Sequence, residues 1–100
     1  MAFVDFLYEA AERAGLLKEA VWSPSDGTET QRAKVDFRAA DETVLDGLAL
    51  STDYVIQYPA SVLTGLASAE ILTVDGNTYR VREVRSLGDG SEKRATLSRL

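Results

Sequence analysis

The most constraining feature of the sequence is the run EILTVDGNTYRVREVR at residues 70–85. Residues 71–74 are rich in aliphatic and β-branched side chains, and residues 78–82 alternate in the manner of a strand. Asp75 and Gly76 stand between the two runs. An Asp-Gly pair in this position predicts a β-hairpin, because the turn requires positive φ angles that Gly adopts without steric cost. A lone hairpin is marginally stable in water, so this one needs further strands to cover its apolar face.

Further strands are predicted on both sides of this hairpin. The clearest is at residues 32–39, where apolar side chains (Ala33, Val35, Phe37, Ala39) alternate with charged ones. This period of two indicates one buried and one solvated face, as in an antiparallel sheet. Other β-rich runs, separated by turn formers, occupy residues 21–23, 53–58 and 93–100. We therefore predict a mainly β fold, a small antiparallel β-sandwich or barrel of five to seven strands preceded by an N-terminal α-helix.

The N-terminal helix is predicted from an apolar stripe of period 3.6 within residues 2–14, formed by Phe3, Phe6, Leu7, Ala10, Ala11 and Ala14. Gly15 is a plausible stop, although residues 16–20 could continue the helix. We assign residues 1–100 to a single domain, with the helix in residues 1–20 and the sandwich or barrel in residues 21–100. Two roles remain open for the stripe: it packs on the sheet of its own chain, or it docks on a neighbouring subunit.

The mid-chain segment at residues 41–52, DETVLDGLALST, is too apolar for a free linker. Val44, Leu45 and Leu48 are its main hydrophobic residues, yet the Asp46-Gly47 pair interrupts any long element. This segment is either a strand after a turn or a loop whose hydrophobic side chains are covered by something outside the chain.

The residues that commonly carry catalysis are missing. The chain has no His and no Cys, which removes the commonest general acid/base, the thiol nucleophile and the commonest ligands of transition metals. The adjacent pair Asp41-Glu42 has no second acidic cluster nearby, and Gly88-Asp89-Gly90 is a hairpin turn rather than a phosphate-binding loop. We predict a protein that is not an enzyme and that needs no metal or other cofactor.

Charge and hydropathy limit the partners further. The net charge of −5 disfavours nucleic-acid binding, which depends on Lys and Arg that neutralise phosphates. Arg80, Arg82 and Arg85 are the exception, as possible contacts to an anion or to DNA, and the competing interpretation is a solvated strand face or a subunit contact. No apolar run is long enough to span a bilayer, and the start MAFVDFLYEA has no basic lead, so we expect a soluble, intracellular protein without membrane contact.

Several segments together resemble the bacteriophage head–tail joining family, the head-completion or stopper proteins of the lambda type. The resemblance lies in the acidic, Ala-rich start MAFVDFLYEAAERA, the segment VLDGLALSTDY followed by VIQYP, and the C-terminal half ILTVDGNTYRVREV…GDGSEKRATLSRL. Tyr79 and Val81 occupy the places where such proteins have a core aromatic residue and a core valine. One departure is Ala69-Glu70, where the family often has Gly-Asp or Gly-Glu before the hairpin.

The resemblance implies a structural protein of the virion. Copies would form a ring between the portal or adaptor complex on the head side and the tail terminator on the tail side, and would help retain packaged DNA. Before assembly in the host cytoplasm the protein would be a monomer. An acidic lining would let DNA pass without binding it. Phe3, Phe6 and Leu7 would then dock on a neighbouring subunit, and Val44, Leu45 and Leu48 would contact a partner protein.

Two alternatives stay open. A tail-completion or terminator-type virion protein can share this size and β-rich character. A small β-barrel binding module for nucleic acid or anions would instead use Arg80 and Arg82, with a base stacked on Tyr79.

Overall fold

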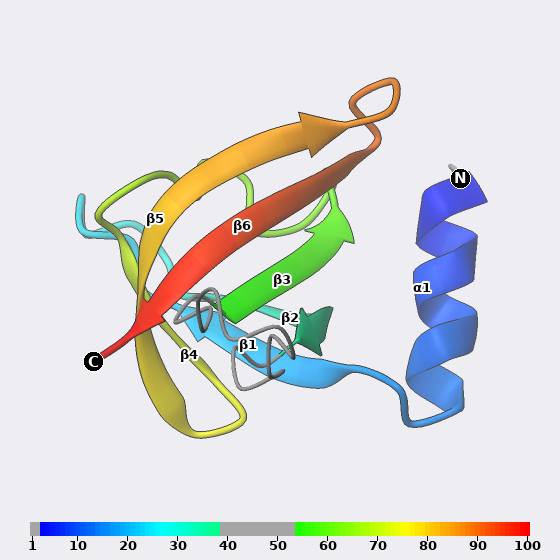
Figure 1. Ribbon diagram of the computed structural model, residues 1–100, viewed down its shortest axis with the longest axis horizontal. Helices are drawn as coiled ribbons and strands as arrows, with labels where there is room; N and C mark the ends of the chain where they lie inside the picture. Colours follow the sequence, from blue (N-terminus) through cyan, green and yellow to red (C-terminus); the bar gives the residue numbers. More distant parts are fainter. Residues whose placement is uncertain (1–2, 39–53) are drawn as a thin grey trace, which may run out of the picture.

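The computed structural model describes residues 3–38 and 54–100, and for residues 3–5 it describes only the backbone. One helix comes first and six strands follow, as Figure 1 shows: α1 (Phe3–Arg13), β1 (Lys18–Trp22), β2 (Gln31–Arg38), β3 (Tyr54–Pro59), β4 (Ile71–Val74), β5 (Asn77–Leu87) and β6 (Glu92–Arg99). The prediction of a mainly β fold with an N-terminal helix is confirmed.

The six strands form a closed antiparallel barrel in the order β1-β2-β3-β6-β5-β4. The last pairing, between β1 and β4, closes the ring of strands and places Ala20 opposite Val74 and Trp22 opposite Leu72. Of the two architectures left open, the sandwich and the barrel, the chain adopts the barrel. Closure leaves no free edge among these strands.

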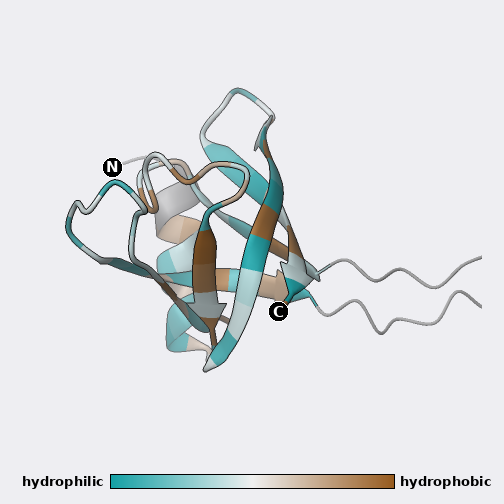
Figure 2. Ribbon diagram, turned by 90° about the vertical axis from the view of Figure 1, so that its left-hand side faces the viewer, coloured by the Kyte–Doolittle hydropathy of each residue, from teal (hydrophilic) through white to brown (hydrophobic). Residues whose placement is uncertain are grey.

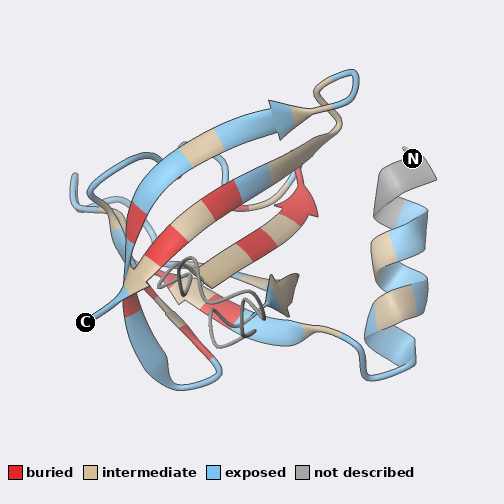
Figure 3. Cartoon of the chain, viewed as in Figure 1, coloured by how far each residue is buried: buried red, intermediate tan, exposed pale blue. Residues whose placement is uncertain are grey.

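The predicted alternation of residues places the core inside the barrel. Along β2, the side chain of Val35 is fully buried and those of Ala33 and Phe37 pack against the core, while Arg32 and Lys34 are exposed. Hydrophilic and hydrophobic residues alternate along the strands (Figure 2), and the buried residues are spread over all the strand pairs (Figure 3). The interior of the barrel is therefore filled by side chains.

The central hairpin forms as its sequence predicts. β4 and β5 pair directly, with Val74 opposite Asn77, so that the loop has two residues. Asp75 has a φ of 52° and Gly76 a φ of 86°, and two positive φ angles in succession are the mark of the type I′ turn that suits twisted strands. The adjacent strand β6 pairs with β5 over most of its length and completes the C-terminal half of the barrel.

The helix is shorter than residues 1–20, because a glycine stop ends it. Gly15 has a φ of 75°, its N–H donates to the carbonyl of Glu12 at 3.0 Å, and the N–H of Leu16 donates to the carbonyl of Ala11 at 3.0 Å. These two bonds form a Schellman motif, which satisfies carbonyls that a helix end leaves unpaired. The continuation through residues 16–20 is wrong: Lys18 already begins β1.

The segment between β3 and β4 is a series of turns that covers one end of the core. Leu63 and Leu66 are buried there. The segment is joined to β5 by two hydrogen bonds, from the Ala69 N–H to the Val81 carbonyl and from the Val81 N–H to the Glu70 carbonyl, both 2.8 Å long. Ala69 has a φ of 78°, a left-handed conformation that costs a residue with a Cβ about 1–2 kcal/mol. The turn thus forms although Ala69 carries a Cβ.

Replacement of Ala69 by Gly should therefore stabilise the protein. We expect Ala69→Gly to raise the free energy of unfolding by about 0.5–1 kcal/mol, because relief of the strained φ outweighs the greater backbone entropy of glycine in the unfolded chain. Urea denaturation measures the change. Ala67→Gly, at an exposed position of the same segment without a positive φ, is the control and should be neutral or destabilising. Equal effects of the two substitutions on stability would contradict the inference that the backbone of Ala69 is strained.

Candidate functional site

Helix α1 lies outside the barrel, against β2 and β3 (Figure 1). A hydrogen bond from the Tyr8 hydroxyl to Glu92 Oε2, 2.5 Å long, fixes the helix to the start of β6. Burial of the phenol raises the pKa of Tyr8 above its ordinary value, and the hydrogen bond to Glu92 and the negative charges of Glu92 and Asp36 act in the same direction. Tyr8 is therefore a neutral hydrogen-bond donor at physiological pH.

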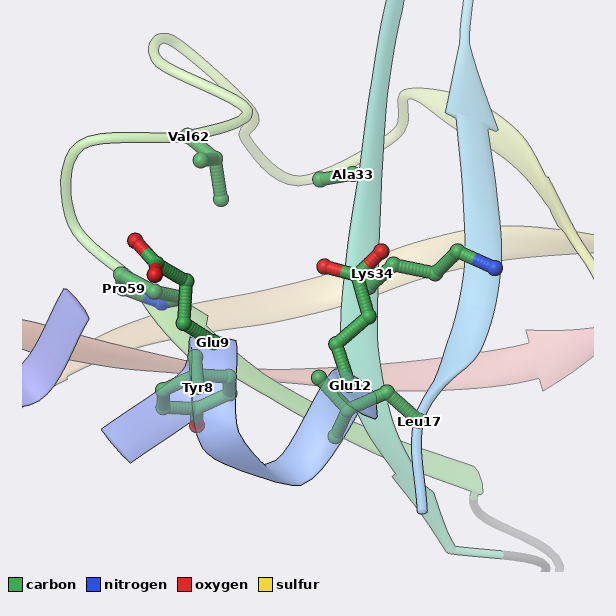
Figure 4. A pocket seen from close by; sticks show the side chains of 8 residues that line it. All are labelled: Tyr8, Glu9, Glu12, Leu17, Ala33, Lys34, Pro59 and Val62. Atoms are coloured by element: carbon green, nitrogen blue, oxygen red, sulfur yellow. The ribbon is translucent and has the colours of Figure 1, made fainter. Parts of the chain in front are cut away.

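Two clefts run between α1 and the barrel. The first, of about 210 Å³, is shown in Figure 4, and it is lined by Tyr8, Glu9, Glu12, Leu17, Ala33, Lys34, Pro59 and Val62. The second, also about 210 Å³, is lined by Leu7, Tyr8, Ala11 and Leu17 together with the carboxylates of Asp36 and Glu92. We call this second cleft the helix groove. Its walls are mainly apolar, and its charged residues are acidic.

The barrel covers only part of the predicted apolar stripe of α1. Ala11 and the neighbouring Tyr8 are half-buried, whereas 54% of Phe6 and 48% of Leu7 stay exposed. About half of Phe6 and of Leu7 is thus left uncovered by the barrel, and both roles of the stripe stay open. For Phe3 only the backbone is described. Val44, Leu45 and Leu48, the mid-chain residues predicted to contact a partner, lie outside the described residues.

Arg80, Arg82 and Arg85 all lie exposed on the outer face of β5, and a β-bulge between Val81 and Glu83 keeps Arg85 on that face. Strict alternation after Val81 would direct Glu83 and Arg85 into the core. The bulge adds one residue and shifts the pattern, so that Val84 packs against the core. Register pairing then sets Arg94 of β6 opposite Arg85. We call Arg80, Arg82, Arg85 and Arg94 the arginine face.

The arginine face is only partly neutralised. Arg85 forms an ion pair with Glu83, while Arg80 and Arg94 form none with any described residue. Like charges directly opposite each other in a sheet, as at Arg85 and Arg94, are destabilising. An anionic surface that covers this face would remove that repulsion.

A cluster of polar side chains joins the β1–β2 loop to the segment before β4. Glu70 accepts hydrogen bonds from the Trp22 indole N–H at 2.9 Å, the Ser25 backbone N–H at 3.0 Å and the Ser25 hydroxyl at 2.5 Å. The bonds from Ser25 and Trp22 lower the pKa of Glu70. Trp22 itself is buried. The geometry accounts for this cluster as a structural link between loops.

Sequence reasoning did not single out Tyr8, Glu92, Arg94 or the acceptor role of Glu70. Tyr8 and Glu92 are 84 residues apart in the chain, and no local pattern links them. The sequence VREV offered a signal for the bulge, since Val81 and Val84 are separated by three positions rather than two.

No group of three or more His, Cys, Asp or Glu side chains that could hold a metal ion occurs in residues 3–38 and 54–100. Within the same residues, no helix is long and apolar enough to cross a membrane.

A small closed β-barrel with an external helix, an apolar groove and exposed hydrophobic side chains has the features of a protein that works by contact with other proteins. Residues 2–97 match the family model of the phage head-tail attachment protein, and the chain therefore belongs to this family. No curated protein matches the chain. The protein is a structural component of the phage head–tail region, and as a family member it interacts with head and tail components of the virion.

Loss of the Tyr8 hydroxyl should loosen α1 without unfolding the barrel. A hydrogen bond to a charged acceptor contributes about 1.5–3 kcal/mol, so Tyr8→Phe should speed amide exchange in α1 about tenfold or more and leave β3 and β6 unchanged. Hydrogen-exchange mass spectrometry or NMR measures both regions. Arg13→Ala, which removes only the exposed ion pair with Glu9, is the control and should change exchange less than threefold. Unaltered protection of α1 in Tyr8→Phe would contradict this anchoring role.

The lowered pKa of Glu70 predicts a pH-dependent contribution to stability. Because the folded state binds the proton less tightly than the unfolded state, the contribution is complete above the ordinary value of 4.5 and is lost as the pH falls through the folded-state pKa. Glu70→Gln should therefore destabilise the protein at pH 7, and the difference from wild type should narrow at pH 3. Urea denaturation at both pH values tests this, with Glu29→Gln in the exposed β1–β2 loop as the control. If the difference in unfolding free energy between wild type and Glu70→Gln were the same at both pH values, the stabilising role of the ionised Glu70 would be contradicted.

Proposed function

We propose that copies of this chain assemble into a ring between the portal or adaptor complex of the head and the terminator of the tail, and that the ring helps retain packaged DNA. The chain would be a monomer in the host cytoplasm and would enter the ring as the head is completed. Support comes from the family membership of residues 2–97 and from the apolar side chains that the fold leaves uncovered.

The exposed side chains of α1 are the main support for a contact with a neighbour. Phe6 and Leu7 lie side by side in sequence, and about half of each side chain is exposed. Apolar surface that an isolated subunit leaves in water is stabilised by about 25 cal/mol for each Å² that assembly buries. In this proposal Phe3, Phe6 and Leu7 dock on the next subunit.

The mid-chain residues Val44, Leu45 and Leu48 would contact the portal, adaptor or tail protein. This assignment rests on the sequence alone, since these residues lie outside the described part of the chain. A segment this apolar, next to the described strands β2 and β3, suits a loop that another protein covers.

Acidic substitutions in the two contact regions test the proposal. We expect Phe6→Asp with Leu7→Asp, and separately Leu45→Asp with Leu48→Asp, to lower the yield of infectious particles at least a hundredfold in a complementation assay. The barrel should stay folded by circular dichroism, because the described members of these pairs lie outside the core. Thr64→Asp with Ala67→Asp, which adds the same charge at exposed positions of the β3–β4 segment, is the control.

Unimpaired joining of heads and tails in either double variant would disprove the corresponding contact. Fractionation of the defective lysate then separates the proposed role from a tail-completion role. A head-side protein is recovered with filled heads that have no tails, whereas a tail-completion protein is recovered with free tails.

A further inference from the structure

The exposed large hydrophobic side chains of the described residues form two separate groups. Phe6, Leu7 and Leu16 belong to α1 and the turn after it, whereas Ile71 and Leu100 belong to the outer surface of β4 and to the C-terminus. Helix α1 and the C-terminus lie at opposite ends of the longest axis in Figure 1. The molecule therefore has apolar surface at both ends.

The group at the C-terminal end borders the arginine face. Register pairing places Ile71 of β4 opposite Arg80 of β5 and Arg80 opposite Ser98 of β6. The Leu100 N–H donates to the Thr78 carbonyl at 3.0 Å, which holds the last residue alongside β5. Because side chains two residues apart in a strand share a face, Ile71, Arg80 and Leu100 lie on the same outer surface of the sheet.

The apolar group at the helix end borders the helix groove. The charged residues of this groove are acidic, whereas those beside the other apolar group are arginines. Leu7 and Ala11 form the apolar wall of this groove, and the carboxylates of Asp36 and Glu92 form its charged wall. An arginine that entered the groove could pair with these carboxylates, while an aliphatic side chain beside it could pack on Leu7. The arginine face offers both: Arg80 could supply the charged group, and Ile71 and Leu100 beside it could supply the aliphatic side chain.

We propose that the helix groove of one copy binds the arginine face of the next copy, with Ile71 and Leu100 packed against Leu7. This inference rests on the proposed ring and identifies the two surfaces that would build it. The surfaces differ, and Arg80 with Ile71 and Leu100 lies toward the C-terminal end, away from α1, so each copy uses one surface toward each neighbour. Such a heterologous contact can continue from copy to copy and close into a ring. Complementary charge sets the register and excludes the pairing of like surfaces.

A second copy fits the arginine face better than a nucleic acid does. Ile71 and Leu100 are exposed beside the arginines, and a phosphate backbone would leave both uncovered. Binding of DNA is therefore the competing outcome of the test rather than a part of the proposal.

Engineered cysteines test the contact directly, because the natural chain has none. Leu7→Cys and Ile71→Cys variants of the full chain, with different affinity tags, are produced together during phage assembly. Joined particles are treated with a short bismaleimide and separated by denaturing electrophoresis. We expect a cross-linked heterodimer with both tags, and at least tenfold less cross-linked dimer in particles made with either variant alone. A prominent dimer of Leu7→Cys alone would overturn the proposal, since it would show that two helices face each other.

Reversal of the charge at Arg80 is a second test of the proposed contact. Arg80→Glu, introduced into the Ile71→Cys chain, should reduce the heterodimer at least tenfold, whereas Lys18→Glu at the exposed start of β1 should leave it unchanged. An undiminished heterodimer in Arg80→Glu would overturn the role of the arginine face. Retention of single-stranded DNA by the wild-type protein on filters at low salt, lost in Arg80→Glu, would also overturn it in favour of nucleic acid.

Failure of the inference and failure of the proposed ring are distinguishable. If heads and tails join normally when the gene is deleted, the proposed function fails. If joining requires the protein and yet no heterodimer forms in joined particles, the function stands and the assignment of the two surfaces fails.

Discussion

The pairing of β1 with β4 is the constraint on which the rest of the structure depends. It connects Ala20, at the start of the chain, to Val74 of the central hairpin, and thereby closes a sheet whose edges would otherwise be exposed. The closed sheet encloses one core to which all six strands contribute side chains. The hydrogen bonds of Glu70 to Trp22 and Ser25 join the same two regions just beyond the ladder.

Closure also determines where contacts with other proteins can occur. A barrel without free edges offers no strand for edge-to-edge pairing among the described residues, so partners must use its outer surface or what is attached to it. On this protein the outer surface carries arginines, and the attached helix carries exposed Phe6 and Leu7. The inside of the barrel provides stability, and the described contacts that we propose use the outside.

The sequence predicted the features that depend on neighbouring residues. The Asp75-Gly76 turn, the alternation along β2 and the stop at Gly15 are local, because each is fixed by the backbone preferences of a few residues. The closure of the barrel, the Tyr8–Glu92 bond and the exposure of Phe6 depend on segments far apart in the chain. Periodicity identified an apolar helix face and the arginines of β5, but it could not show which side chains the barrel covers or that a bulge keeps Arg85 outside.

The Schellman stop at Gly15 also limits how far the helix can travel. Between Arg13 and Lys18 the chain has only residues 14–17, and four residues span at most about 14 Å when fully extended. A helix released from Tyr8 and Glu92 would stay tethered to its own barrel within that radius. It could change its tilt to fit a neighbour without leaving the vicinity of its own barrel.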